Sequence, residues 1–383
     1  MTETAACLHE SLEEIDAATW DALANPADAP YNPFVSHAFL LALEQSGSAT
    51  TETGWQAAHL TLEQAGTACA AVPMYIKSHS YGEYVFDHGW AQAFERAGGQ
   101  YYPKLQITVP FTPATGPRLL TGNNPKIIPL LTETIKRLTV KMELSSAHIT
   151  FQNQSEADAL AALGFLQRYD QQFHWHNEGY TCFGDFLTRL SSIKRKNLRR
   201  ERNEALCAGI EVELLTGSDL KEHHWDAFFG FYMDTGSRKW GSPYLTREFF
   251  SLINQSMSRD TLLVMARRNG RYIAGALNFI GSETLYGRNW GAIEHHPFLH
   301  FELCYYQAIE FAISRGLKTV EAGAQGEHKL ARGYLPVRTC SSHWIAHAGL
   351  RDAVARYLKD ERVAVSENIE ILSGHSPFKR YPE

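Results

Sequence analysis

The segment from Glu321 to Lys329 combines side chains that could carry acid–base chemistry. It leaves a predicted strand, passes two glycines and then places Glu327, His328 and Lys329 in succession, with Arg332 shortly after. A carboxylate or imidazole can accept a proton, and a Lys or Arg cation can stabilise an oxyanion or a phosphate. Ligands bind at strand ends in α/β sheets. We therefore predict catalytic roles for Glu327, His328 and Lys329 and ligand contacts for Gln325, Gly326 and Arg332. The alternative is a solvated loop whose charges pair with one another.

A second group stands at the start of a predicted helix over residues 301–315. On a helical wheel Glu302 lies on the same stripe as apolar positions, so it should point inward. A carboxylate there either accepts amides of its own helix or has a shifted pKa beside a cleft. We predict catalytic roles for His300 and Glu302 and ligand contacts for Tyr305 and Tyr306, with a locally satisfied helix-start acid as the alternative.

A basic face is the third candidate, on a helix predicted over about residues 186–206. Five cations fall on one side of this helix and apolar residues on the other: Arg195, Lys196, Arg199, Arg200 and Arg202. Such a face can bind the phosphates of a carrier by counterion release. The alternative is an ordinary solvated amphipathic helix. We predict donor binding by Arg195, Lys196, Arg199 and Arg200.

The composition limits the class of protein. The chain has 383 residues, 44% of them hydrophobic, and 36 Lys and Arg stand against 42 Asp and Glu, for a net charge of −6. These values are typical of a globular protein and exclude a disordered or collagen-like chain. They also argue against DNA binding over the whole surface, so any phosphate binding should be local. The length favours two domains.

Cysteines, histidines and the first residues carry weaker signals. The six cysteines are scattered with no Cys-x-x-Cys pair, which favours reduced thiols. We expect no metal site, although His295, His296, His300 and Glu302 are the nearest candidate ligands. Residues 1–20 lack the basic start and apolar middle of a secretory signal, and no apolar stretch reaches the length of a membrane span. We expect a cytoplasmic protein of unknown oligomeric state.

The predicted elements occur in one order, used twice. Each half begins with two helices and continues with a meander of strands. The first half then ends in a helix, a strand, a helix and a strand, and the second half ends in a similar series. Gly66 and Gly270 mark the hairpin of each meander, about half a chain apart. We predict two similar domains, residues 1–178 and 179–383. A single α+β domain with coincidental periodicity is the alternative.

This order is similar to the GNAT (acyl-CoA N-acyltransferase) fold, and two copies resemble the FemAB-like acyltransferases. The resemblance covers nearly the whole chain and is closest to the peptidoglycan-biosynthesis-like group. It rests on these segments: Tyr101–Leu105, Val109–Pro113, Gly116–Leu120, Arg195–Arg202, Pro243–Thr246, Leu299–Tyr306, Gly323–Lys329 and Arg332–Tyr334. It implies a mixed α/β fold of tandem GNAT-like domains, each a mostly antiparallel sheet flanked by helices. It also implies that Lys329, followed by Tyr334, resembles the transition-state lysine of Fem-type transferases.

The expected function is transfer of an acyl or aminoacyl group from an activated carrier to a primary amine, with the second domain as the catalytic half. The donor co-substrate would be acyl-CoA or aminoacyl-tRNA, without a permanently bound cofactor, and the acceptor a small molecule or a peptidoglycan-precursor-like amine. The GNAT pyrophosphate loop has no match after Trp290, which disfavours a plain acetyl-CoA site. The alternatives are a GNAT acetyltransferase acting on a small metabolite and a non-catalytic ligand-binding or scaffold protein.

Overall fold

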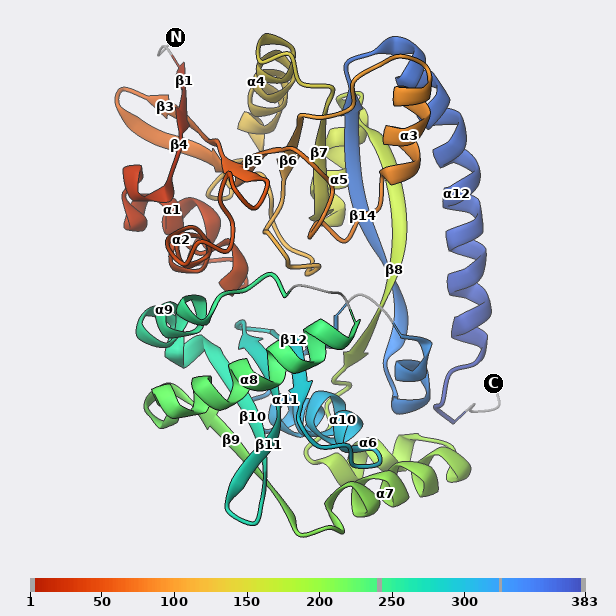
Figure 1. Ribbon diagram of the computed structural model, residues 1–383. Helices are drawn as coiled ribbons and strands as arrows, with labels where there is room; N and C mark the ends of the chain where they lie inside the picture. The colour runs from red at the N-terminus through yellow and green to blue at the C-terminus, as the bar shows by residue number, and fades with distance from the viewer. Residues whose placement is uncertain (1–3, 240–242, 324–325, 380–383) are drawn as a thin grey trace. The chain divides into compact units, whose positions relative to one another are not determined.

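The computed structural model of the chain describes residues 4–239, 243–323 and 326–379 (Figure 1). It divides into two compact units. Unit 1 comprises Met1–Asp170 and Arg338–Glu367, and unit 2 comprises Gln171–Val337 and Asn368–Glu383. The strands β8 (Leu166–His176) and β14 (Leu335–Ile345) and the helix α12 (Ala348–Gly374) have residues in both units. The predicted boundary between two similar domains, residues 1–178 and 179–383, stays a prediction.

Unit 1 contains two sheets. The first has the strand order β1-β3-β4, and the second runs β2-β5-β6-β7-β14-β8. Helix α1 packs on β4, and α4 packs on β7. The elements are β1 (Thr4–His9), α1 (Ala17–Ala24), α2 (His37–Gln45), β2 (Trp55–Ala57), β3 (His59–Gln64), β4 (Thr67–Val72), β5 (Met74–Lys77), α3 (His88–Arg96), β6 (Lys104–Ile107), α4 (Ile128–Lys141), β7 (Ser146–Gln152) and α5 (Gln154–Ala162).

Unit 2 has one sheet, in the order β8-β13-β12-β11-β10-β9. Two helices lie between β8 and β9, two lie between β9 and β10, and a bent helix joins β12 to β13. The elements are α6 (Phe183–Arg189), α7 (Ser192–Leu206), β9 (Ile210–Thr216), α8 (Glu222–Lys239), α9 (Arg247–Met257), β10 (Thr261–Arg268), β11 (Arg271–Ile280), β12 (Thr284–Ala292), α10 (Leu299–Phe301), the π-helical turn η6 (Glu302–Tyr306), α11 (Gln307–Ser314), β13 (Thr319–Glu321) and the 3₁₀ helix η7 (Glu327–Arg332).

The two units share their hairpins and their strand directions. Both hairpin turns place two consecutive residues at positive φ, Ala65 and Gly66 between β3 and β4 and Asn269 and Gly270 between β10 and β11. This is the backbone that a two-residue turn needs to match the twist of its strands. In each unit one parallel pair follows the antiparallel meander, β6 with β7 and β12 with β13. The predicted hairpins and the predicted mixed α/β class, with mostly antiparallel sheets flanked by helices, are confirmed.

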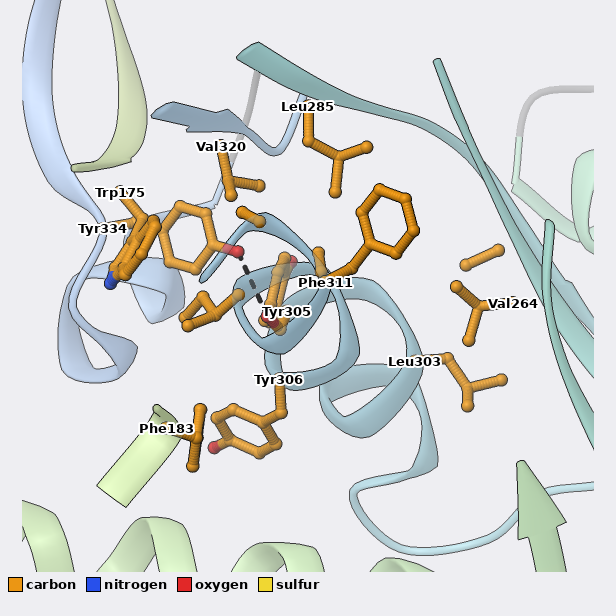
Figure 2. Close-up of a cluster of buried hydrophobic side chains, with 14 of the residues drawn as sticks. Trp175, Phe183, Val264, Leu285, Leu303, Tyr305, Tyr306, Phe311, Val320 and Tyr334 are labelled. Atoms are coloured by element: carbon orange, nitrogen blue, oxygen red, sulfur yellow. Dashed lines mark hydrogen bonds between the residues drawn. The ribbon is translucent and has the colours of Figure 1, made fainter. Parts of the chain in front are cut away.

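Helices cover both faces of the unit 2 sheet because adjacent residues of a strand point to opposite sides. On β10, Met265 faces Phe228 of α8 at Gly275, where an added Cβ would clash with both side chains. The neighbouring Val264 belongs to the core on the other face, with Leu303 of η6 (Figure 2). The bent helix that carries the candidate residues is therefore anchored in the main core of unit 2.

The basic helix differs from the prediction over residues 186–206. Two helices occupy this range, because Leu190 is extended, fully buried and bridged to Phe378. The backbone N–H of Ser191 donates to the carbonyl of Pro377 at 3.0 Å, and α7 starts after this turn. Pairing with the C-terminal segment thus interrupts a pattern that reads locally as one helix.

Two of the segments on which the family resemblance rests, Tyr101–Leu105 and Gly116–Leu120, contribute buried cations to unit 1. Lys104 has no exposed surface, and its ammonium donates to Asp87 at 2.5 Å and to Glu83 at 2.7 Å. Arg118, also buried, donates from Nη2 to the carbonyl of Ala114 at 2.7 Å and from Nε to that of Thr150 at 2.9 Å. Both cations are satisfied within the fold, as buried charges must be.

Candidate functional site

A pocket opens in unit 2 where two parallel strands diverge. The pairing of β12 with β13 ends at Tyr286 and Glu321, and β12 continues to Ala292 beyond it. The pocket has a volume of about 80 Å³. Its lining comes from β11, β12, the bent helix and the end of β13: Ala276, Leu277, Asn278, Gly287, Arg288, Asn289, Trp290, His300, Cys304, Tyr305 and Ala322.

A β-bulge shapes the strand side of this pocket. Leu277 pairs with Asn289 and Asn278 pairs with Gly287, so Arg288 is the extra residue on β12. A bulge of this kind bends a strand and redirects its side chains. At Gly287 an added Cβ would lie 3.3 Å from the carbonyl oxygen of Glu321 and 3.4 Å from Oδ1 of Asn278. Glycine therefore keeps this part of the lining open.

Aromatic rings line the helix side of the pocket. The ring of His300 lies edge-on to Trp290 at 5.1 Å and to Tyr305 at 5.4 Å between centroids. The phenol of Tyr305 shares a hydrogen bond of 2.9 Å with Nε2 of His328. Burial raises the pKa of Tyr305 far above its ordinary value, so this phenol is neutral. Of the predicted residues, His300 and Tyr305 line the pocket and His328 contacts that lining.

The short helix η7 places a buried lysine beside an accessible imidazole. Lys329 is 2% exposed, and its ammonium donates to the carbonyl of Gly323 at 2.9 Å. Burial lowers the pKa of Lys329 to about 8. His328 is exposed, and Glu327 at the start of η7 is exposed as well. Gly326 precedes η7 with a φ of 116°, and Gln325 lies outside the described residues.

Arg332 and Tyr306 meet a residue that the sequence analysis did not single out. Nη2 of Arg332 donates to both carboxylate oxygens of Glu201 on α7, each at 3.0 Å. The phenol of Tyr306 donates to the same carboxylate. Glu201 sits among basic residues in the sequence, and no local pattern shows that it turns towards η7. Its partners are more than a hundred residues away, so only the fold identifies it.

Glu302 faces α7 and not the pocket. Its side chain is fully buried and accepts from Nη2 of Arg202 at 2.7 Å, from Nε of Arg202 at 3.0 Å and from the amide of Gln307 at 2.7 Å. Arg202 also donates to Glu310 at 2.8 and 2.9 Å. Although burial acts the other way, the hydrogen bonds that Arg202 donates to these carboxylates raise the pKa of Arg202. The catalytic role predicted for Glu302 stays a prediction, and its contacts are those of a buried ion pair.

The remaining cations of α7 divide by exposure. Lys196, Arg199 and Arg200 are exposed and Arg195 is half-buried, while Leu198 and Ala205 are buried on the other side of the helix. Arg202 is the member of the basic run that turns inward to the ion pair just described. The exposed cations are placed to meet an anionic ligand, and their predicted role stays a prediction.

The residues that the structure describes contain no group of three or more His, Cys, Asp or Glu side chains arranged to hold a metal ion. Among the same residues, no helix is both long and apolar enough to cross a bilayer.

Comparison with known proteins places this architecture. The family model FemAB_like, described as peptidoglycan biosynthesis/recognition, matches residues 11–380. No curated protein sequence matches the chain. Among solved structures, FemX superposes with a TM-score of 0.55 at 12% identity, covering 92% of this chain and all of FemX. L-PGS from Bacillus licheniformis gives 0.50 at 8% identity over 87% of this chain and 99% of its own.

A tandem GNAT protein from the clavulanic acid biosynthesis pathway gives a TM-score of 0.46 at 11% identity, over 90% of this chain and 99% of its own. The family match spans nearly the whole sequence and includes both halves of the repeated order. The expectation of an enzyme of the acyltransferase class is confirmed with it. The chain therefore belongs to the FemAB-like family.

Proposed function

We propose that this protein moves an acyl or aminoacyl group from an activated carrier to the primary amine of a peptidoglycan-precursor-like acceptor, and that unit 2 performs the chemistry. The donor is acyl-CoA or aminoacyl-tRNA, bound as a co-substrate. Both carriers are cytoplasmic, so the proposal assigns the reaction to the cytoplasm. Membership of the FemAB-like family supports the reaction class.

The observation that carries the proposal is the pocket at the diverging strands of unit 2. It brings His300 and Tyr305 to one cavity, and Tyr305 joins it to His328 and thereby to Lys329 on η7. The cavity of about 80 Å³ is large enough for a short acyl group but too small for a whole peptidoglycan-precursor-like acceptor. The arrangement thus offers a place for a carbonyl group with titratable side chains at its edge.

These side chains match the needs of amide formation. The attacking amine must lose a proton, and the exposed imidazole of His328 or the carboxylate of Glu327 can accept it. The carbonyl oxygen becomes an oxyanion as the new C–N bond forms. An ammonium has three N–H donors and Gly323 takes one, so Lys329 can direct another at that oxygen. The intermediate then collapses and releases the thiol of CoA or the ribose hydroxyl of tRNA.

The function is tested by incubating the purified protein with acyl-CoA or aminoacyl-tRNA, each labelled in the acyl group, and with an amine-bearing peptidoglycan precursor. We expect the label in an amide of the acceptor with one of the two donors. A label that stays on both donors, while either donor still shifts the melting temperature, would contradict transfer and favour a binding protein.

The basic face of α7 gives a separate prediction. Replacing Arg199 and Arg200 with alanine removes two exposed cations and should weaken donor binding, with the slope of log Kd against log salt concentration reduced by up to about two. Fluorescence anisotropy over a salt series measures this. Arg271→Ala and Arg315→Ala are the control, since both residues are exposed cations of unit 2 that are not part of α7. An unchanged affinity in the α7 variant would exclude this face as the anchor.

A further inference from the structure

Glu201 on α7 holds two elements of the candidate site at once. One carboxylate accepts two hydrogen bonds from Arg332 at the end of η7 and one from Tyr306 in the π-helical turn. The side chain of Arg332 is 8% exposed and that of Glu201 12% exposed. An Arg–carboxylate pair in which one nitrogen contacts both oxygens, and which is this little exposed, is a charge-assisted contact that restrains both partners. Glu201 is thus a rigid link from α7 to the end of η7.

Arg332 passes this restraint to the residues before it. Its Nη1 donates to the carbonyl oxygen of His328 at 2.6 Å, which fixes the backbone one residue before Lys329. Its guanidinium lies 3.4 Å from the centroid of the Phe301 ring, and that ring stacks on Tyr305 at 6.0 Å. The same arginine therefore ties the backbone of η7 to the aromatic wall of the pocket.

We propose that Glu201 is a positioning residue whose carboxylate, acting through Arg332, holds η7 against the pocket and keeps Lys329 out of water. The inference rests on the proposed function, since η7 carries the side chains assigned to the chemistry. Glu201 itself does not line the pocket. Its contribution is to fix where the backbone of η7 lies, and small displacements of such groups are costly to catalysis.

The position of η7 and the pKa of Lys329 should depend on each other. Lys329 is buried, and burial is the cause of its lowered pKa. If the ion pair at the end of η7 is lost, the helix can move away and water can reach the ammonium. The pKa of Lys329 should then rise towards the ordinary value for lysine, even though the substitution is on another helix.

The test is Glu201→Gln, read out by the reactivity of Lys329. Trace labelling with acetic anhydride across a pH series, followed by mass spectrometry of the peptide that contains Lys329, gives its pKa in the intact protein without any substrate. We expect a rise of at least about one unit from a value near 8. Glu204→Gln is the matched control, because Glu204 is an exposed residue of the same helix. It should leave the pKa of Lys329 unchanged.

Two more variants separate the arms of the link. Arg332→Lys keeps the charge but loses the guanidinium that contacts Glu201 through Nη2 and the His328 carbonyl through Nη1 at the same time, and it should raise the pKa of Lys329 as Glu201→Gln does. It also serves if Glu201→Gln does not fold. Tyr306→Phe removes only the hydroxyl group, which donates to Glu201, and should leave the pKa of Lys329 unchanged. An unchanged pKa in both folded variants of the ion pair, or an equal rise in Tyr306→Phe, would overturn the role given to Arg332.

The same variants tell this inference apart from the proposed function. If transfer activity is found, Glu201→Gln should lower kcat by about 100-fold with little change in the KM for the donor. If no donor supports transfer but the labelling shifts as expected, the positioning role holds and the proposed reaction fails. If transfer occurs and neither the labelling nor kcat responds, the reaction stands and the positioning role fails.

Discussion

Replacing Lys329 with methionine is expected to lower kcat by about 100-fold to 1,000-fold, because it removes a preorganised N–H donor from the place where negative charge develops. Methionine fills a similar volume and is apolar, so the buried site should accept it. The melting temperature should not fall, since the wild-type protein buries an ammonium there and burial lowers its pKa. Steady-state kinetics and thermal denaturation check the two parts.

The pH dependence of the wild-type protein follows from the same residue. Lys329 stabilises an oxyanion only while it is protonated, so kcat should fall as the pH rises through about 8, and this limb should be absent in the methionine variant. The folded pKa lies below the unfolded one. The unfolded state therefore binds more protons between about pH 8 and pH 10.5, and the contribution of this residue to stability rises over that range.

Lys318→Met is the control for this experiment. Lys318 lies in unit 2 and its side chain is 69% exposed in an ion pair with Glu283, so its loss should alter neither kcat nor the pH profile. If kcat instead rises through pH 8, Lys329 acts as the base and not as the oxyanion donor. Normal turnover in the Lys329 variant would remove this residue from the mechanism.

Replacing Glu302 with glutamine should have the largest effect on stability. Glu302 is fully buried and pairs with Arg202, whose own side chain is 18% exposed. Removing Glu302 leaves the guanidinium of Arg202 with only the more exposed carboxylate of Glu310, which costs up to about 3–5 kcal/mol of the free energy of unfolding. We expect a clearly lower midpoint in urea denaturation. Activity per folded molecule should change much less.

Glu310→Gln is the matched comparison for Glu302. The carboxylate of Glu310 pairs with the same arginine but is 38% exposed, so water replaces part of the lost interaction and the cost should stay below about 1 kcal/mol. The opposite result is equally clear. A strong loss of kcat in Glu302→Gln with an unchanged denaturation midpoint would show that this carboxylate takes part in the chemistry, as its position at the helix start suggests.

The sequence alone indicated the hairpins, the fold class and the family, but the predicted order of elements was incomplete, because it lacked the strands β1 and β9, which precede the two helices of each half, and the helix α3. These features depend on periodicity over short windows and on residues such as Asn269 and Gly270 that select a turn. The positions at which one element ends and the next begins were harder to predict from the sequence. The interruption at Leu190 follows from its pairing with Phe378, and no local pattern contains that contact.

The candidate site was only partly predictable for the same reason. His300 and Tyr305 could be recognised as polar and aromatic residues at the start of one helix, and both line the pocket. The place of Arg288 in the pocket lining could not be recognised, because Arg288 is the extra residue of a bulge, and a bulge is defined by which residues the neighbouring strand pairs with. The periodicity of the sequence predicts the strands but not the register in which neighbouring strands pair.

The tertiary structure alone decides which residues of α7 form ion pairs and with which partners. Composition and spacing showed that this helix is basic, but only the packing of α7 against the bent helix and η7 turns Arg202 towards Glu302 and Glu201 towards Arg332. A residue's type fixes which partners it can accept. Whether it meets a partner, a ligand or water depends on groups that the chain brings back from a hundred or more residues away, and burial then decides how strongly they interact.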